Sequence, residues 1–187
     1  MIAIQEILWH GRGGQGVVVG SSILGRVLAL YEGKYAMSIP HFGVQRRGAP
    51  LTALTRISDT PIRRRDLLAD PDYIVILDDS LTPTAVANCG HEKPRHIIVN
   101  SKKSAAELDL TDWPSVTIVD ADSIALEVLN RPISNTVMVG AVAGLLEFVR
   151  IDSVKRAIAD VLSPEIAPRN MEAAEAGFKI VRVSDVK

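Results

Sequence analysis

A glycine-rich stretch near the amino terminus constrains the fold more than any other part of the sequence. Four glycines occur within six residues: Gly11, Gly13, Gly14 and Gly16. They separate an apolar run, residues 2–8, from a helical pattern, residues 17–30. Such a turn needs glycine because the backbone adopts positive φ angles and because a phosphate approaches the amides closely only where no Cβ intervenes. The stretch predicts a phosphate- or nucleotide-binding turn, with a tight strand–helix turn that binds no ligand as the alternative.

The dinucleotide-binding form of this motif also needs an acidic residue about 20 positions further on, at the end of the second strand, to hold a ribose hydroxyl. Glu32 lies near that distance, but it falls in the turn before the expected strand, residues 35–39. That strand ends in Ser38-Ile39-Pro40 and offers no acid. The sequence therefore disfavours NAD as the ligand of the glycine turn.

Composition restricts the class of protein. With 187 residues, of which 47% are hydrophobic, the chain predicts one domain, residues 1–187, with a large core. The 21 basic and 22 acidic residues leave a net charge of −1, which favours neither nucleic acid nor an anionic membrane as a partner. A single cysteine, Cys89, excludes an intrachain disulfide and an iron–sulfur cluster held by cysteines of this chain alone. We expect a cytoplasmic location, because the first residues lack a signal-peptide pattern and no apolar run is long enough to span a membrane.

Strand and helix patterns alternate along most of the chain. Apolar or alternating runs predict further strands at 51–58, 73–77, 96–100 and 115–120. Asp78-Asp79-Ser80 follows one of them, and we interpret these residues as the start of a helix rather than as a metal or acid–base site. The pattern predicts an α/β fold with a single doubly wound, Rossmann-like, mostly parallel sheet, in which ligands bind at the carboxyl ends of the strands.

The carboxyl-terminal part of the sequence is predicted to be helical. Asp122 or Ser123 is a candidate cap for a helix that reaches Leu129. The next helix, residues 136–149, contains small residues that allow a neighbouring backbone to come close: Gly140, Ala141, Ala143 and Gly144. Two helices follow, at 154–162 and 171–176, and Gly177 is predicted to end the last one.

A second distinctive loop, residues 40–50, follows the expected second strand. It combines two prolines, two glycines and the adjacent pair Arg46-Arg47, which is the composition of a shaped surface loop. Loops that follow neighbouring strands of a doubly wound sheet emerge at one edge, so we expect this loop to meet the glycine turn, with Arg46 and Arg47 facing the same cleft as Gly13 to Gly16. A solvated connection, or an ion pair between one arginine and a partner subunit, is the alternative.

Four motifs occur in an order that resembles a known family. They are the glycine turn, the loop that ends in Arg46-Arg47-Gly48-Ala49-Pro50, the segment 55–62, and the segment 135–141. Together, and over nearly the whole chain, they resemble the gamma subunit of 2-oxoacid:ferredoxin oxidoreductases of the pyruvate and 2-oxoisovalerate type. The resemblance implies a complex that decarboxylates a 2-oxoacid oxidatively, reduces ferredoxin and forms an acyl-coenzyme A.

The same resemblance implies what this chain would and would not contribute. Thiamine diphosphate, magnesium and the iron–sulfur clusters would be held by alpha, beta and delta-type subunits, so the isolated chain is expected to be inactive and to carry no catalytic or metal-binding residue. Its own contribution would be an interface and a surface for coenzyme A. The candidate cofactor-binding residues are Gly11, Gly13, Gly14, Gln15, Gly16, Arg46, Arg47 and Gly48. A free-standing nucleotide-dependent oxidoreductase that uses the glycine turn directly is the alternative function.

Overall fold

Six strands form one mixed sheet in the order β2-β3-β1-β4-β5-β6 in the computed structural model, which describes residues 4–41, 48–64, 70–90 and 93–184. The strands are β1 (Gln5–Arg12), β2 (Tyr35–His41), β3 (Pro50–Ser58), β4 (Tyr73–Ile76), β5 (His96–Asn100) and β6 (Val116–Val119). The helices are α1 (Val17–Arg26), α2 (Thr82–Ala87), α3 (Ala121–Leu129), α4 (Asn135–Leu145), α5 (Ile151–Val161) and α6 (Ala167–Ser184). A π-helical turn, Val27–Tyr31, extends α1, and a 3-10 turn, Asp79–Leu81, precedes α2.

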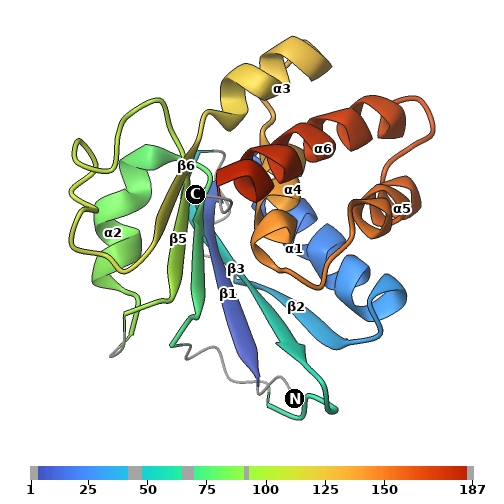
Figure 1. Cartoon of the computed structure of the whole chain (residues 1–187), viewed down its shortest axis with the longest axis horizontal. Coiled ribbons are helices and arrows are strands. Elements are labelled where there is room, and N and C mark those ends of the chain that lie inside the picture. Colours follow the sequence, from blue (N-terminus) through green and yellow to red (C-terminus); the bar gives the residue numbers. More distant parts are fainter. Residues whose placement is uncertain (1–3, 42–47, 65–69, 91–92, 185–187) are drawn as a thin grey trace.

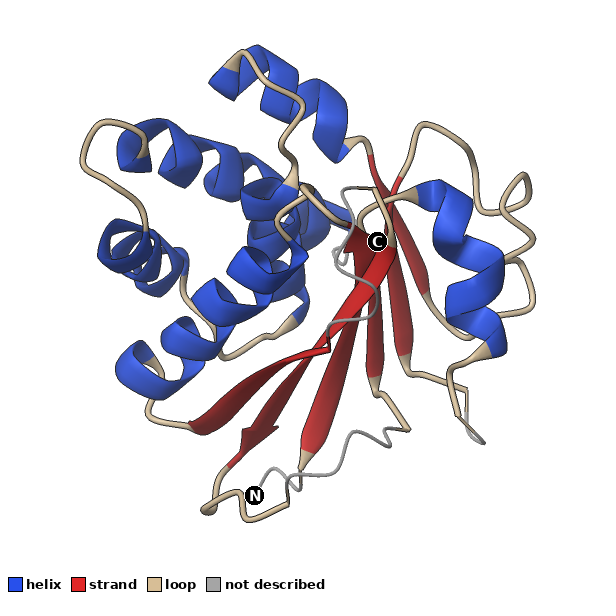
Figure 2. Cartoon of the chain, turned by 180° about the vertical axis from the view of Figure 1, so that it is seen from behind, coloured by secondary structure: helices blue, strands red, loops and turns tan. Residues whose placement is uncertain are grey.

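The sheet is mostly parallel, and helices cover both of its faces. Strand β1 is parallel to β4, which is parallel to β5, which in turn is parallel to β6. Strand β3 lies between β1 and β2 and is antiparallel to both. Figures 1 and 2 show α1, α4, α5 and α6 on one side of the sheet and α2 on the other. The predicted class, a doubly wound, Rossmann-like α/β fold with a helical carboxyl-terminal part, is confirmed.

The central strands lie in the core. Ile74, Val75 and Ile76 of β4 are fully buried, as expected for a continuous apolar strand in a parallel sheet that is covered on both faces. Trp9 of β1 is also fully buried, and its indole Nε1 donates a hydrogen bond to Thr55 Oγ1 on β3 at 3.1 Å. This bond satisfies the one polar atom of the indole and joins β1 to its antiparallel neighbour. Within the described ranges, no helix has the length and apolar character needed to cross a bilayer.

Helices α4 and α6 pack closely enough to bring their backbones together. A Cβ atom on Gly140 would lie 1.8 Å from the carbonyl oxygen of Ala174, and one on Gly177 would lie 2.1 Å from the carbonyl oxygen of Val137. The prediction that small residues in α4 serve close packing is therefore confirmed at Gly140. The prediction that Gly177 ends the last helix is wrong, because Gly177 lies inside α6 and is needed for contact with α4.

Two helix starts show how short polar side chains position the elements. The Asp78 carboxylate accepts a hydrogen bond from the backbone amide of Ser80 at 3.1 Å, so the capping interpretation of this segment is confirmed. Helix α3 begins at Ala121 and is capped by Asp120, whose carboxylate accepts from the amide of Ser123 at 3.1 Å. The expected caps at Asp122 or Ser123 are wrong, because strand β6 ends directly before Asp120 and the helix begins without an intervening loop.

Candidate functional site

The glycine turn lies at the carboxyl end of β1 and leads into α1. Gly11 belongs to β1 itself, so the turn is shorter than the sequence indicated. Gly14 and Gly16 have φ angles of 99° and 78°, in the left-handed region where glycine is favoured. Gly16 is the residue that caps α1, and a Cβ atom there would lie 2.4 Å from the side chain of Asn135. Gly16 is therefore required by the contact between α1 and α4 as well as by the turn.

Part of the second loop pairs directly with the glycine turn. The amide of Gly13 donates to the carbonyl oxygen of Ala49 at 2.9 Å, and the amide of Gly48 donates to the carbonyl oxygen of Gly13 at 3.1 Å. The structure thus brings Gly48 together with Gly13 of the glycine turn. Arg46 and Arg47 lie outside the described residues, so their predicted approach to the turn remains a prediction.

The amides of the turn fall into two groups. Gly13 and Gln15 use their amides within the chain, because Gln15 donates to the carbonyl oxygen of Arg12 at 3.0 Å. Among the described residues, the amides of Gly14, Gly16, Val17 and Val18 have no acceptor. A Cβ atom built on Gly14 would meet no atom within 4 Å, so the space above it is open. An anion could therefore reach these four amides at the positive end of the α1 dipole.

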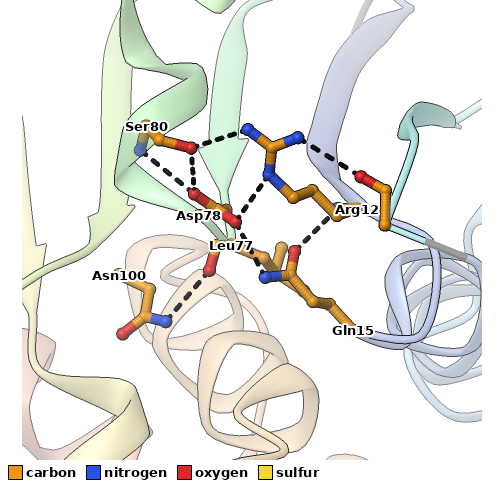
Figure 3. Close-up of polar contacts among 7 residues, drawn as sticks. Arg12, Gln15, Leu77, Asp78, Ser80 and Asn100 are labelled. Carbon is orange, nitrogen blue, oxygen red and sulfur yellow. Dashed lines mark hydrogen bonds and ion pairs between the residues drawn. The ribbon is translucent and has the colours of Figure 1, made fainter.

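Arg12 connects the glycine turn to the residues that follow the carboxyl end of β4 (Figure 3). Its Nε donates to Asp78 Oδ2 at 3.0 Å, its Nη2 donates to Ser80 Oγ at 2.9 Å, and its Nη1 donates to the Gly48 carbonyl oxygen at 3.2 Å. Three segments that are distant in the sequence are held together by this one guanidinium. Sequence reasoning missed Arg12, although its place between Gly11 and Gly13 was a usable signal.

Gln15 has a positioning role in this network (Figure 3). Its Oε1 accepts from the Arg12 amide at 2.7 Å, and its Nε2 donates to Asp78 Oδ2 at 3.1 Å. Burial by itself would raise the pKa of Asp78, but hydrogen bonds from Ser80 and Gln15 and the charge of Arg12 outweigh it and lower the pKa below the usual range. Asp78 is therefore a stable anion that fixes Arg12 and Gln15, and the predicted ligand residue Gln15 is already engaged within the chain.

A polar crevice of about 380 Å³ opens beside Gln15, along the carboxyl ends of β4, β5 and β6. Its charged lining residues are Asp78, Asp79, Asp120, Asp122, Lys102 and Lys103. Lys103 pairs with Asp79 at 3.0 Å, Lys102 lies 3.9 Å from Asp120, and Asp78 is paired with Arg12, which leaves the carboxylates in excess by one. In the part of the chain that the structure describes, no group of three acidic, histidine or cysteine side chains could hold a metal ion. The excess of carboxylates makes this crevice a poor place for a phosphate.

Asn100 holds the walls of the crevice together (Figure 3). Its Nδ2 donates to the Leu77 carbonyl oxygen at 3.0 Å and to Ser134 Oγ at 3.2 Å, and its Oδ1 accepts from the Ala121 amide at 2.9 Å. Asn100 is 5% exposed, and its Oδ1 also accepts from the Asp122 amide at 3.2 Å. Both donors and both acceptor positions of its side-chain amide are therefore used. One sequence signal pointed to Asn100, since it is a polar residue at the end of an otherwise apolar strand.

His10 is a buried titratable group directly before Gly11, and burial lowers its pKa to about 4. No described residue makes a hydrogen bond to its Nε2. An unfolded chain takes up a proton at His10 below about pH 6.5, whereas the folded chain does so only near pH 4. We expect the free energy of unfolding to fall by about 3 kcal/mol as the pH drops from 6.5 to 4. Urea unfolding between pH 6.5 and 4 should show this fall in the free energy of unfolding. In His10→Gln, the dependence of the free energy of unfolding on pH should be mostly removed over the same range. An identical pH dependence in the variant would contradict the assignment.

Glu32, the acid closest to the position that a dinucleotide ribose would need, is occupied elsewhere. Its Oε1 accepts from the Arg150 amide at 2.9 Å, and the Arg150 guanidinium Nε lies 3.7 Å from the same oxygen. Glu32 follows the π-helical turn, at the end of the α1 segment that is remote from Gly16. The structure therefore places this carboxylate at the junction with α5 and not beside the glycine turn.

The fold and the site define a class: an α/β protein with a glycine turn at the carboxyl edge of its sheet. A family model described as pyruvate ferredoxin/flavodoxin oxidoreductase matches residues 6–180. The chain belongs to this family. It is 45% identical to the pyruvate/ketoisovalerate oxidoreductases common subunit gamma of Thermococcus litoralis, with 93% of this chain and 95% of that protein covered.

Two further similarities extend this finding. The chain is 40% identical to the NADH-dependent phenylglyoxylate dehydrogenase subunit gamma of Aromatoleum evansii, with 97% and 96% of the two chains covered. The crystal structure of pyruvate oxidoreductase subunit PORC from Thermotoga maritima superposes with a TM-score of 0.80 at 31% identity, covering 95% of this chain and 97% of that chain. The relatives are gamma-type subunits of nearly the same length, so the expected family and subunit type are confirmed.

Proposed function

We propose that this chain is the gamma subunit of a cytoplasmic complex that oxidises pyruvate or 2-oxoisovalerate, forms the acyl-coenzyme A and reduces ferredoxin. Similarity to gamma subunits over nearly the full length supports the assignment. Alpha, beta and delta-type subunits would hold thiamine diphosphate, magnesium and the iron–sulfur clusters. The single cysteine of the sequence, Cys89, cannot supply the several thiolates that such a cluster needs.

The glycine turn is the part of this chain that we assign to coenzyme A. The observation that carries the assignment is the pairing of Gly13 with Gly48 and Ala49, which joins the two glycine-containing loops at the carboxyl edge. Phosphates would be held over the amides of Gly14 and Gly16 and the first turn of α1, where the space is open. The neighbouring crevice, with its excess of aspartates, would instead suit the uncharged hydroxyl and amine groups of the ligand.

The alternative, a free-standing nucleotide-dependent oxidoreductase, is not favoured. Its ribose-binding acid would have to be Glu32, which is paired with Arg150. The 2-oxoacid itself would be selected in other chains, because relatives at 45% and 40% identity carry the names of oxidoreductases for different substrates.

Purification of the tagged chain from its native cells, with identification of the bound proteins by mass, tests the assignment. We expect chains with cysteine motifs for iron–sulfur clusters and a thiamine-binding chain to be recovered with it. The recovered complex should reduce ferredoxin with pyruvate or 2-oxoisovalerate only when coenzyme A is present. A chain that is recovered alone and oxidises a substrate with a nicotinamide nucleotide would overturn the proposal.

Replacement of Arg47 by alanine in the assembled complex is expected to raise the Michaelis constant for coenzyme A by about 10- to 100-fold. A charge-assisted hydrogen bond from a guanidinium to a phosphate contributes roughly 1.5–3 kcal/mol, which corresponds to this change. Arg63→Ala is the matched control, because Arg63 is an exposed arginine of a separate basic run. Size-exclusion chromatography distinguishes the alternative: an intact complex with an unchanged Michaelis constant would exclude the phosphate role, and a dissociated complex would assign Arg47 to a subunit interface.

A further inference from the structure

A groove of about 550 Å³ lies among the helices on the face of the sheet that α1, α4, α5 and α6 cover (Figure 1), apart from the polar crevice. It is formed where α3 and α5 end and where α1, α4 and α6 begin. Its apolar lining consists of Val19, Leu129, Ile133, Leu162 and Ile166. Three of these side chains are exposed for their type: Ile166 by 50%, Ile133 by 40% and Val19 by 37%. Aliphatic side chains gathered around a groove in this way typically mark a binding surface.

The charges around the groove are predominantly positive. Arg131 and Arg169 line it, and neither forms an ion pair with a carboxylate of the described residues. Among the described residues that line the groove, Glu165 is the only acid, and hydrogen bonds from the Ser163 side chain and from its own backbone amide lower its pKa, so it remains ionised. The amino-terminal ends of α4, at Asn135, and of α6, at Ala167, add their positive dipole ends, whereas the end of α1 is the one assigned above to the phosphates of coenzyme A. A complementary surface would therefore carry aliphatic side chains flanked by carboxylates.

We propose that this groove is the docking site for an acidic segment of a partner subunit, with aliphatic side chains inserted between Ile133 and Ile166 and carboxylates bound by Arg131 and Arg169. The inference rests on the proposed function, because it requires the partner subunits of the oxidoreductase. Aliphatic side chains of the partner would cover the exposed Ile133 and Ile166. Its carboxylates would pair with Arg131 and Arg169, which have no carboxylate partner in the described part of the chain.

The test measures binding of the full-length chain, labelled with a fluorophore, to the remaining subunits of its own complex. Ile133→Asp/Ile166→Asp and Arg131→Gln/Arg169→Gln are compared with the wild type. Each is expected to weaken binding by about 10- to 100-fold, as loss of central interface contacts commonly does. The arginine variant should also lose most of the salt dependence that the wild type shows. Circular dichroism and thermal unfolding should be unchanged, because all four side chains are exposed.

Leu30→Asp is the matched control, since Leu30 is 58% exposed on the π-helical turn and does not line the groove. It should bind as the wild type does. If the wild type binds and both groove variants bind equally well, the docking site is wrong while the proposed function stays intact. If Leu30→Asp loses as much affinity as the groove variants, the effect is not specific to the groove and the docking site is also wrong. If the isolated wild type is a dimer in sedimentation and the groove variants are monomers, the groove is an interface between two copies of this chain, and the proposal is wrong. Failure of the wild-type chain to bind any subunit would instead contradict the proposed function.

Discussion

Replacement of Gly140 by alanine is expected to lower the free energy of unfolding by about 3 kcal/mol or more. The new Cβ atom would lie 1.8 Å from the carbonyl oxygen of Ala174 and 2.6 Å from its carbonyl carbon. Both atoms belong to the backbone of α6, so no side-chain rotation can relieve the overlap. The two helices would have to separate, and the buried contacts between them would be lost. Urea unfolding followed by circular dichroism measures the change.

Two further glycines make this experiment specific. Gly177→Ala should have a similar effect, because it places a methyl group 2.1 Å from the Val137 carbonyl oxygen at the same helix crossing. Gly25→Ala is the matched control: it also lies in a helix, but its Cβ would be 3.5 Å from Ser38 Cβ, an ordinary contact. Alanine there should stabilise the chain by about 0.5–1 kcal/mol through its helix propensity. Wild-type stability of Gly140→Ala would show that α4 and α6 do not cross in this way.

These glycines also show where sequence reasoning is limited. Small residues in the α4 segment predicted a close backbone approach, and the structure confirms it. The sequence alone predicts a helix end at Gly177, because a glycine that ends a helix and a glycine that admits a neighbouring helix look the same in one sequence. The two cases differ only in the partner, and the partner of Gly177 is Val137, 40 positions earlier. Local patterns could not supply that contact.

The order of the strands was a second limit. Alternating and apolar runs located all six strands, because burial on one or two faces leaves a direct mark on the sequence. They did not reveal that β3 would insert between β1 and β2 in the antiparallel sense. The loop that contains Gly48 does return to the glycine turn as expected, but for another reason: Pro50 at the start of β3 pairs with Arg12 at the end of β1.

The polar connections of the site were the least predictable part. The local sequence predicts a helix cap at Asp78, and Asp78 does cap the turn through the amide of Ser80. Its bonds to Arg12 and Gln15 join residues 66 and 63 positions apart and arise because β1 and β4 are parallel neighbours. The register of two strands sets such contacts, and the register depends on packing across the whole sheet.

Loss of the ion pair between Glu6 and Arg56 is expected to cost about 3–5 kcal/mol of the free energy of unfolding when only one partner is removed. Arg56 is fully buried and Glu6 is 5% exposed, and Arg56 Nε donates to Glu6 Oε1 at 2.6 Å. Arg56 Nη1 also donates to the Arg64 carbonyl oxygen at 2.8 Å. Arg56→Met would leave the Glu6 carboxylate buried without its guanidinium, and desolvation of that unpaired charge is the main cost.

Removal of both charges separates this desolvation cost from the net value of the pair. Glu6→Leu/Arg56→Met should be more stable than Arg56→Met, because no charge is left unpaired between β1 and β3, and replacing a buried pair by apolar side chains is often close to neutral. Urea unfolding of the wild type, the two single variants and the double variant gives the coupling energy directly. The pair lies at the end of β1 remote from the glycine turn, so coenzyme A dependence of the assembled complex should persist in the double variant. Additive losses, with the double variant the least stable of the four, would mean that packing of the two long side chains, rather than the pairing of their charges, holds β1 to β3 at this end.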